Sequence, residues 1–447
     1  MERAAFELVD SGLQFVSSRG QLSRPSPGLA LINGEEVAVG LDAECSARLN
    51  PRRLHSRFWQ ELSTAPLGRP FPSYLRTADL AHAHLKAVWD LVGGGTEEVI
   101  FAVPGIYTDD QLALFLGITR ELAIPVRGLI DAAVAAAADR EVEPHCLHLD
   151  LHLHRAVLTE LEHGEENVRT GVHVEPRVGL LGLRDIWARI IAQTFVRATR
   201  FDPLHLAATE QVLYARLTDY IEGLAEHDST QVRIASGGRQ HAVGLDRSRI
   251  VDATRSAYDI LSSLVSDHAP PDGATLLLSH RAAALPGLAD HLKENSDHTV
   301  EVLHPAAAGG GALAHADRIR SPDSALPFVT RLPAFDARPP GPVTVPVTPP
   351  PDGARHLPTH LVIDGVAHRI GSDPLIFGPT GVEDGGDIDP HAATVRRIAG
   401  QAVLDAPAEA GVTVNGEQLE GRTALAPGDR LRVGTVDREI LAVSMAE

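Results

Sequence analysis

The sequence predicts a large α/β domain that a proline-rich segment joins to a small all-β domain. Strand-like and helix-like apolar patterns alternate from residue 4 to residue 320. Residues 321–358 are rich in proline and contain the string RPPGPVTVPVTPPPDGARHLP. Beyond them, short strand-like runs are separated by turn signals, a pattern typical of a β-sandwich. We therefore expect domains at 1–320 and 359–447, with a semi-rigid extended linker at 321–358.

Within the first domain, the order of strand and helix signals predicts a parallel or mixed sheet flanked by helices. The first half of the domain has six expected elements: a strand over 6–10, a hairpin within 29–41, a helix over 77–92, a strand over 98–103, a helix over 109–122 and an alanine-rich helix over 131–139. The second half continues with a strand pair over 146–161, helical patterns over 182–224 and 250–268, a strand over 275–278, a helix over 285–292, a strand over 300–303 and a small-residue helix over 306–318.

One predicted strand carries an unusual set of histidines. His148, Asp150, His152 and His154 alternate with leucines, so the polar side chains should share one face of the strand. Two imidazoles at this spacing suit a transition metal such as zinc, copper, iron or nickel. A metal site at His148, His152 and His154 is one hypothesis, and a solvated or interface-facing strand is the other.

Length, charge and cysteine content limit the classes of function. The chain has 447 residues, of which 44% are hydrophobic. It is too long for one hydrophobic core, since single cores stop growing at roughly 250–300 residues, and we expect more than one domain. A formal net charge of −19 disfavours bare nucleic acid as a partner, because clustered Lys and Arg supply most of that affinity. The two cysteines are far apart and suggest neither a disulfide framework nor a thiolate zinc site.

The sequence also lacks the signals of secretion and of the membrane. Its first residues, MERAAFELVDSG, have no basic start followed by an apolar core, and no apolar run approaches the ~18 residues that a membrane helix needs. We expect a cytoplasmic protein without a membrane span, whose partners are proteins.

Five segments of the first domain occur in an order that resembles a known family. They are LVDSG at 8–12, EEVIFAVPGIYTDDQLALFLGITRELAIPVRGLIDAAVAAAA at 97–138, HLDLHLHRAVLTEL at 148–161, TLLLSHRAAALPGL at 275–288 and AAAGGGALAHA at 306–316. They resemble parts of the DnaK-type chaperones. Residues 8–12 and 148–161 resemble the first phosphate loop and the second phosphate hairpin, and residues 97–138 resemble a strand–turn–helix unit. Residues 275–288 resemble the adenosine loop, and residues 306–316 resemble the closing helix. The resemblance implies a two-lobed actin/DnaK-like ATPase fold with ribonuclease H-like repeats.

The same resemblance implies where a nucleotide and its magnesium would bind. The implied nucleotide and magnesium positions are Asp10, Gly12, Asp150, Gly287 and Gly310. Asp131 stands where the family has a catalytic Glu. Two carboxylates would hold a hydrated magnesium ion while the third orients the attacking water. The alternative is that these aspartates only cap a helix or end strands.

Departures from the family pattern decide which function we expect. Glycines in phosphate loops let backbone N–H groups approach the phosphates. Here His152, Leu153 and His154 replace the glycines of the second loop, while Ser279 and His280 replace the glycine pair of the adenosine loop. We therefore expect a degenerate nucleotide site that takes no cofactor, with ATP and magnesium as its ligands only if the site is active.

The end of the chain resembles a forkhead-associated (FHA) domain, a β-sandwich that binds phosphothreonine peptides. The resemblance is carried by GVTVNGEQLEGRTALAPGDRLRVGT at 411–435. Where that family has Gly-Arg, a loop Ser-Arg and a loop Asn, this chain has Gly378-Pro379, Ile388-Asp389 and Ala410. Phosphate recognition needs arginine and hydroxyl donors. We therefore expect contacts with proteins that do not depend on phosphorylation.

Two functions follow from these patterns. The first is a protein-interaction scaffold, chaperone-like regulator or assembly factor that no longer hydrolyses ATP well. The alternative is a weak Mg-ATPase that uses closure of its lobes as a switch and could form filaments.

Overall fold

The computed structural model has a mixed α/β architecture with several sheets. The structure describes residues 2–138, 140, 144–271, 273–296, 298–321, 326–333, 360–363, 366–370, 375–378, 381–384, 393–398, 401–406, 411–414, 417–419, 421–425, 429–433 and 440–443. The chain divides into two compact units, Met1–Thr348 and Pro349–Glu447. Most of the expected linker lies outside the described residues. Residues 328–333, which we also expected in the linker, instead form strands of the first unit.

The first unit contains a five-stranded sheet in the order β15-β7-β6-β1-β2. Its strands are β1 (Arg3–Glu7), β2 (Gln14–Ser17), β6 (Glu98–Val103), β7 (Val126–Asp131) and β15 (Phe328–Val329). The β1–β2 pair is antiparallel and the other pairs are parallel. One face packs on α2 (Thr77–Val92) and α3 (Asp109–Glu121), where Phe6, Phe101 and Phe115 are fully buried.

Between β2 and α2 the chain forms a small subdomain. It consists of β3 (Ala30–Asn33), β4 (Glu36–Val39), α1 (Gly40–Glu44), a 3₁₀ turn η1 (Pro51–Arg53) and β5 (Leu54–His55). The hairpin expected about Asn33 and Gly34 is confirmed, because β3 and β4 pair across this turn and Gly34 has a φ of 65°. Leu29 and Leu31 of this subdomain pack with Leu153, which lies more than 120 residues further along the chain.

A six-stranded sheet forms the other half of the first unit, in the order β14-β13-β8-β9-β10-β16. Its strands are β8 (His145–Leu151), β9 (Ala156–His163), β10 (Glu166–Glu175), β13 (Thr275–Leu278), β14 (Thr299–Val302) and β16 (Arg331–Pro333). The helices of this half are α5 (Leu180–Thr199), α6 (Ala207–Ala215), α7 (Leu217–Glu226), α8 (Arg247–His268), α9 (His280–Ala283) and α10 (Leu288–Glu294). A hairpin of β11 (Ser229–Ser236) and β12 (Arg239–Asp246) joins α7 to α8.

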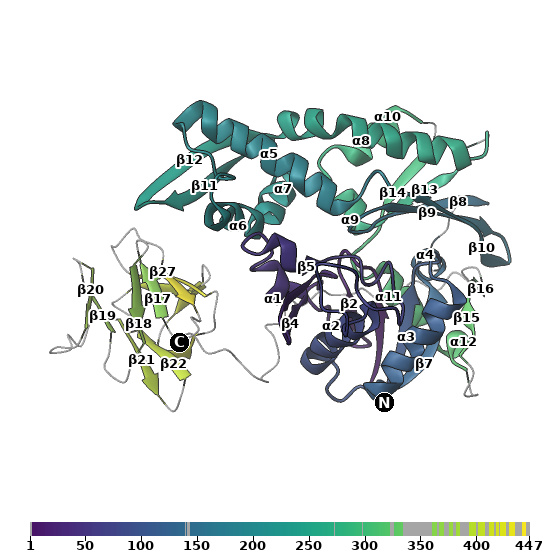
Figure 1. Ribbon diagram of the computed structural model, residues 1–447, viewed down its shortest axis with the longest axis horizontal. Coiled ribbons are helices and arrows are strands. Elements are labelled where there is room, and N and C mark those ends of the chain that lie inside the picture. Colours follow the sequence, from purple (N-terminus) through teal and green to yellow (C-terminus); the bar gives the residue numbers. More distant parts are fainter. Residues whose placement is uncertain are drawn as a thin grey trace. The chain divides into compact units, whose positions relative to one another are not determined.

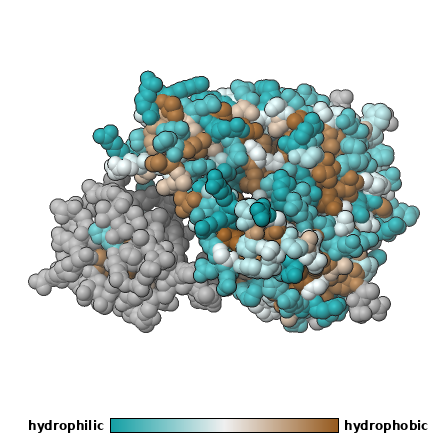
Figure 2. Space-filling model, viewed as in Figure 1, coloured by the Kyte–Doolittle hydropathy of each residue, from teal (hydrophilic) through white to brown (hydrophobic). Residues whose placement is uncertain are grey.

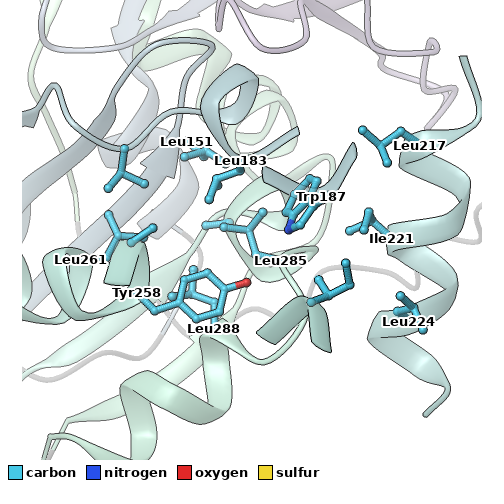
Figure 3. Packing of buried hydrophobic residues seen from close by; sticks show 14 of the residues in the cluster. Leu151, Leu183, Trp187, Leu217, Ile221, Leu224, Tyr258, Leu261, Leu285 and Leu288 are labelled. Atoms are coloured by element: carbon cyan, nitrogen blue, oxygen red, sulfur yellow. The ribbon is translucent and has the colours of Figure 1, made fainter. Parts of the chain in front are cut away.

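The outer face of this second sheet is buried under α5 and α8, which run side by side in Figure 1. Figure 3 shows how the helices meet: Trp187 of α5 lies near Leu285, while Leu217, Ile221 and Leu224 of α7 project toward the same core. Each large apolar side chain buried there contributes roughly 1.5–3 kcal/mol. This packing fixes the sheet that carries the second half of the candidate site.

Helices made almost entirely of small residues pack on the inner faces of the two sheets. They are α4 (Ala132–Ala137) and α11 (Ala307–Ala314). The short helix α12 (Ala316–Ile319) follows α11 and adds Ala316 and Ile319 to the same core. A Cβ atom at Gly311 would lie only 1.9 Å from the carbonyl oxygen of Ala135, so α11 and α4 touch through their backbones. Alanine and glycine are required at this contact because larger side chains would separate the helices.

The second unit consists of two antiparallel sheets in its described residues. The strands are β17 (His360–Ile363), β18 (Val366–Arg369), β19 (Leu375–Gly378), β20 (Gly381–Asp384), β21 (Thr394–Ile398), β22 (Gln401–Ala406), β23 (Val412–Val414), β24 (Glu417–Leu419), β25 (Gly421–Ala424), β26 (Arg430–Val433) and β27 (Ile440–Val443). One sheet has the order β18-β17-β27-β26-β23-β24 and the other β20-β19-β21-β22-β25. Leu361 and Leu431 of the first sheet share one core with Val395 and Leu404 of the second.

The surface of the chain mixes polar and apolar residues. Figure 2 shows several separate hydrophobic areas among hydrophilic ones on the face in view. Among the described helices, none is both long enough and apolar enough to cross a bilayer.

Candidate functional site

The turns that follow β1 and β8 meet at the centre of the first unit. We call residues 10–12 the first turn and residues 152–155 the second turn. Asp10 is buried, and its Oδ1 accepts a hydrogen bond from the N–H of Leu153 at 2.9 Å. The Nδ1 of His152 lies 3.1 Å from the same oxygen. Ser11 Oγ donates to the carbonyl of Leu151 at 2.6 Å. The two turns are therefore bonded directly to each other.

Backbone N–H groups near both turns are already used inside the protein. Five donors with their acceptors are Gly12 to Val9 O (3.0 Å), Leu13 to Ser26 O (2.8 Å), Leu151 to Asp150 Oδ1 (2.8 Å), His152 to Arg155 O (2.8 Å) and Leu153 to Asp10 Oδ1 (2.9 Å). A phosphate-binding loop needs such groups free to point at the anion. These five donors are satisfied by the protein itself.

The environment of Asp10 favours its charged form. Burial alone would raise the pKa of this carboxyl, but the adjacent His152 and the N–H of Leu153 outweigh burial and lower the pKa below its ordinary value. Two buried atoms here, Asp10 Oδ2 and His152 Nε2, have no hydrogen-bond partner among the described residues. Asp10 thus keeps one unshared oxygen.

Asp150 is paired with an arginine that the sequence analysis did not single out. Arg281 lies in α9, and its Nε and Nη2 donate to the two oxygens of Asp150 at 3.0 and 2.9 Å. Nη2 also contacts the Oε1 of Glu7, which lies at the end of β1. All three side chains are buried, with exposures of 9% for Arg281, 6% for Asp150 and 7% for Glu7. One guanidinium therefore joins carboxylates from both sheets.

The buried arginine changes the protonation of the groups around it. Burial would raise the pKa of Asp150, but Arg281 outweighs burial and holds the pKa of this carboxyl far below its ordinary value. Burial raises the pKa of Glu7 despite the same arginine. Burial also lowers the pKa of His148 to about 4, so this imidazole is neutral at physiological pH. The pair of Asp150 and Arg281 is ionised at neutral pH.

Asp131 caps a helix. Its Oδ1 accepts from the N–H groups of Ala133 and Val134 at 2.9 and 3.2 Å, at the start of α4. Its Oδ2 accepts from Arg169 Nη1 of β10 at 2.7 Å. Burial raises the pKa of Asp131, although Arg169 and the two N–H groups oppose this rise. Both oxygens are occupied, so the helix-capping alternative describes Asp131 better than a water-orienting role.

The predicted histidine face does not form. Strand β8 ends at Leu151, and His152 and His154 lie in the second turn instead of on the strand. The reason is that Leu153 packs with Leu29 and Leu31 of the small subdomain, whereas the leucines of β8 pack under α5 and α8. His152 contacts Asp10, and His154 Nε2 lies 2.9 Å from Ser56 Oγ. Within the described residues, His148, His152 and His154 form no metal-ligand cluster.

Two of the three predicted glycines have a structural explanation. Gly12 packs against Pro25, where a Cβ atom would lie 2.8 Å from the proline Cβ. Gly287 has a φ of 79° and precedes α10, a conformation that favours glycine. A Cβ atom at Gly310 would meet no atom within 4 Å. Packing and backbone conformation therefore explain Gly12 and Gly287, and nothing in the structure explains Gly310.

Glu7 and Arg281 are site residues that no motif in the sequence marks. Glu7 interrupts the apolar run of residues 4–9, and Arg281 follows the buried strand β13 after two residues. A charged side chain at a buried position needs an opposite charge or a hydrogen-bond partner. That requirement was readable in the sequence, but the identity of the partner was not.

These residues do not fit ATP and magnesium. Magnesium prefers several hard oxygen ligands, yet the oxygens of Asp150 and Asp131 already accept hydrogen bonds from arginines and N–H groups. The Asp10 Oδ2 atom is the unshared oxygen of these three carboxylates. The Arg281 guanidinium would also repel a second cation at Asp150.

No protein-family model matches the chain, and no curated protein matches it significantly.

Proposed function

We propose that the chain is a non-catalytic, actin/DnaK-like scaffold whose nucleotide site is closed by its own side chains. In this role it docks partner proteins as a regulator or assembly factor. The observation that carries the proposal is Arg281, whose buried guanidinium joins Glu7 and Asp150 from the two sheets. A cation of the protein itself takes the place of a bound metal there.

The arrangement of the two sheets supports an actin/DnaK-like fold. In each sheet a hairpin is extended on one side by parallel strands: β2-β1-β6-β7 in the first and β9-β8-β13-β14 in the second. Such a repeat is what two ribonuclease H-like halves predict. The small-residue helices α4 and α11 lie in the segments that resemble the family's strand–turn–helix unit and its closing helix, and they pack against each other.

The second unit fits an FHA-like protein-contact module. Its described strands form sheets of six and five strands around one shared core, which is compatible with an FHA sandwich. The positions that depart from the phosphothreonine-binding pattern, Pro379, Ile388, Asp389 and Ala410, lie outside the described residues. So do the positions that match the family pattern, namely His391, Ala392, Gly416, Gly428 and Gly434. The proposal of phosphorylation-independent contacts therefore depends on the sequence of these positions.

Equilibrium binding of labelled ATP with magnesium tests the scaffold function. We expect the full chain to show no saturable ATP binding and no ATP hydrolysis. The backbone N–H groups near the two turns and the carboxylates of Asp131 and Asp150 already form hydrogen bonds within the protein. An Arg281→Met variant should not gain binding, since the first and second turns remain bonded to each other. Saturable binding in the low micromolar range with measurable hydrolysis would overturn the proposal.

A weak Mg-ATPase is the second candidate, and the unshared Oδ2 of Asp10 favours it. If Asp10 helps to hold a nucleotide, ATP with magnesium should protect the wild type from limited proteolysis and should not protect Asp10→Asn. An identical digestion pattern with and without ATP in the wild type removes this candidate.

A further inference from the structure

Three potential metal ligands meet on the second sheet, away from both turns. Glu160 lies on β9, His173 lies on β10 and His268 is the last residue of α8. The Oε1 of Glu160 lies 2.8 Å from His173 Nε2 and 3.2 Å from His268 Nδ1. One ligand atom from each residue lies within 4.8 Å of the other two.

The backbone brings these side chains together through a β-bulge and a glycine. The register between β9 and β10 shifts between Arg169 and Gly171, so that Gly171 pairs with Glu160. His173 is two residues further and projects on the same face as Glu160. A Cβ atom at Gly171 would lie 2.8 Å from Glu160 Oε2 and 3.0 Å from His173 Nε2. The missing side chain is what lets Glu160 and His173 meet.

The two imidazole rings are arranged around the carboxylate. Their centroids are 3.4 Å apart with an interplanar angle of 24°, so the rings stack. Glu160 Oε1 hydrogen-bonds to His173 and lies 3.2 Å from His268 Nδ1, so the three groups already lie together without an ion. The side chains are 28–30% exposed, which leaves a path for an ion from solvent.

The chemistry of this set points to a divalent transition metal. Two imidazoles and one carboxylate are ligands that zinc accepts at about 2.0–2.2 Å, with ligand atoms about 3.3 Å apart in a tetrahedron. The observed separations of 2.8 and 3.2 Å between Glu160 and the two histidines are close to that spacing. The two rings would rotate out of their stack to direct both nitrogens at one ion. Oxygen-preferring magnesium or calcium would select more carboxylates and fewer imidazoles.

We propose that Glu160, His173 and His268 form a binding site for one zinc-like divalent transition ion per chain. Three protein ligands leave a coordination position for water or for a group of a bound partner. This site is independent of the proposed scaffold function and of the histidines in the second turn.

Zinc titration of the full chain tests the site, using tag-free protein dialysed first against a chelator. Calorimetry should give one equivalent of Zn²⁺, and Co²⁺ as a substitute should show the visible absorption of a low-coordinate site. His173→Ala and His268→Ala should each weaken binding by more than the roughly 10–100-fold that changes outside the ligand set cost. His205→Ala, a change at an exposed histidine elsewhere in the unit, should leave affinity unchanged.

A glycine variant separates the geometry from the ligands. Gly171→Ala keeps every ligand but places a methyl group between Glu160 and His173, so it should also weaken Zn²⁺ binding. Urea unfolding curves establish that each variant is folded, and Glu160→Gln provides a further ligand change if one histidine variant does not fold. The proposal is overturned if the wild type binds no equivalent of Zn²⁺, or if the affinity is unchanged in His173→Ala and His268→Ala.

Discussion

Replacing Arg281 with methionine should destabilise the first unit more than any comparable change at an exposed arginine. Arg281, Glu7 and Asp150 are all at most 9% exposed, so the substitution leaves two carboxylates buried without their cation. Removing one partner of a buried ion pair typically costs about 3–5 kcal/mol. We expect a loss of that size in the free energy of unfolding at pH 7.5.

The loss should shrink as the pH falls. In the wild type the folded pKa of Asp150 is depressed, so its contribution to stability is present above its ordinary value of 3.8 and is lost as the pH falls through the folded value. In the variant, burial without the cation should raise the folded pKa values of both carboxyls. Below the ordinary pKa values of 3.8 for Asp150 and 4.5 for Glu7, both carboxyls of the variant are neutral and their burial costs little. As the pH rises through the raised folded pKa values, the variant loses stability. The difference between the two proteins should therefore be smaller at pH 4 than at pH 7.5.

Urea denaturation followed by tryptophan fluorescence measures this difference, because Trp187 lies in the core of the second sheet. The matched control is Arg247→Met. Arg247 pairs with Asp290 at 3.0 Å, but the two side chains are 30% and 63% exposed, so the control should lose only about 0–1 kcal/mol. Replacing Glu7, Asp150 and Arg281 together by Gln, Asn and Met should restore most of the loss. An Arg281→Met variant as stable as the control at pH 7.5 would refute the reasoning.

Other substitutions test the contacts around the site by thermal unfolding. Gly311→Ala should destabilise by about 1–3 kcal/mol, because its Cβ would lie 1.9 Å from the Ala135 carbonyl oxygen, whereas Gly310→Ala should stabilise by about 0.5–1 kcal/mol. Equal effects of these two changes would contradict the close packing of α11 on α4. Asp131→Ala removes the N-cap of α4, which should lower the free energy of unfolding by about 0.5–2 kcal/mol. It also removes the ion pair with Arg169. Asp131→Asn keeps a capping oxygen and should lose less; an equal or larger loss would argue against the capping role.

Long apolar patterns in the sequence were sufficient to place several elements. The helix expected over 77–92 and the strand expected over 98–103 are α2 and β6 with the same bounds. Apolar side chains of α2 and β6 pack into the same core. Gly93 ends α2 and Pro104 follows β6. The strand expected over 6–10 instead ends at Glu7, because Asp10 turns to bond the second turn.

The candidate site was less predictable because its contacts join distant parts of the chain. Alternation of leucine and histidine continues through Leu153, so the sequence predicts one strand where the structure has a strand and a turn. Leu153 leaves the strand because it fills a different core from that of Leu151. Arg281 and Glu7 are 274 residues apart in the sequence, so no local sequence pattern predicts their ion pair.

Amide hydrogen exchange at the first and second turns tests the central claim, which is that the protein itself occupies the groups a phosphate would bind. The N–H groups of Gly12, His152 and Leu153 should exchange slowly without nucleotide, and ATP with magnesium should not change their rates. Fast exchange that becomes slow only when ATP and magnesium are added would contradict the account.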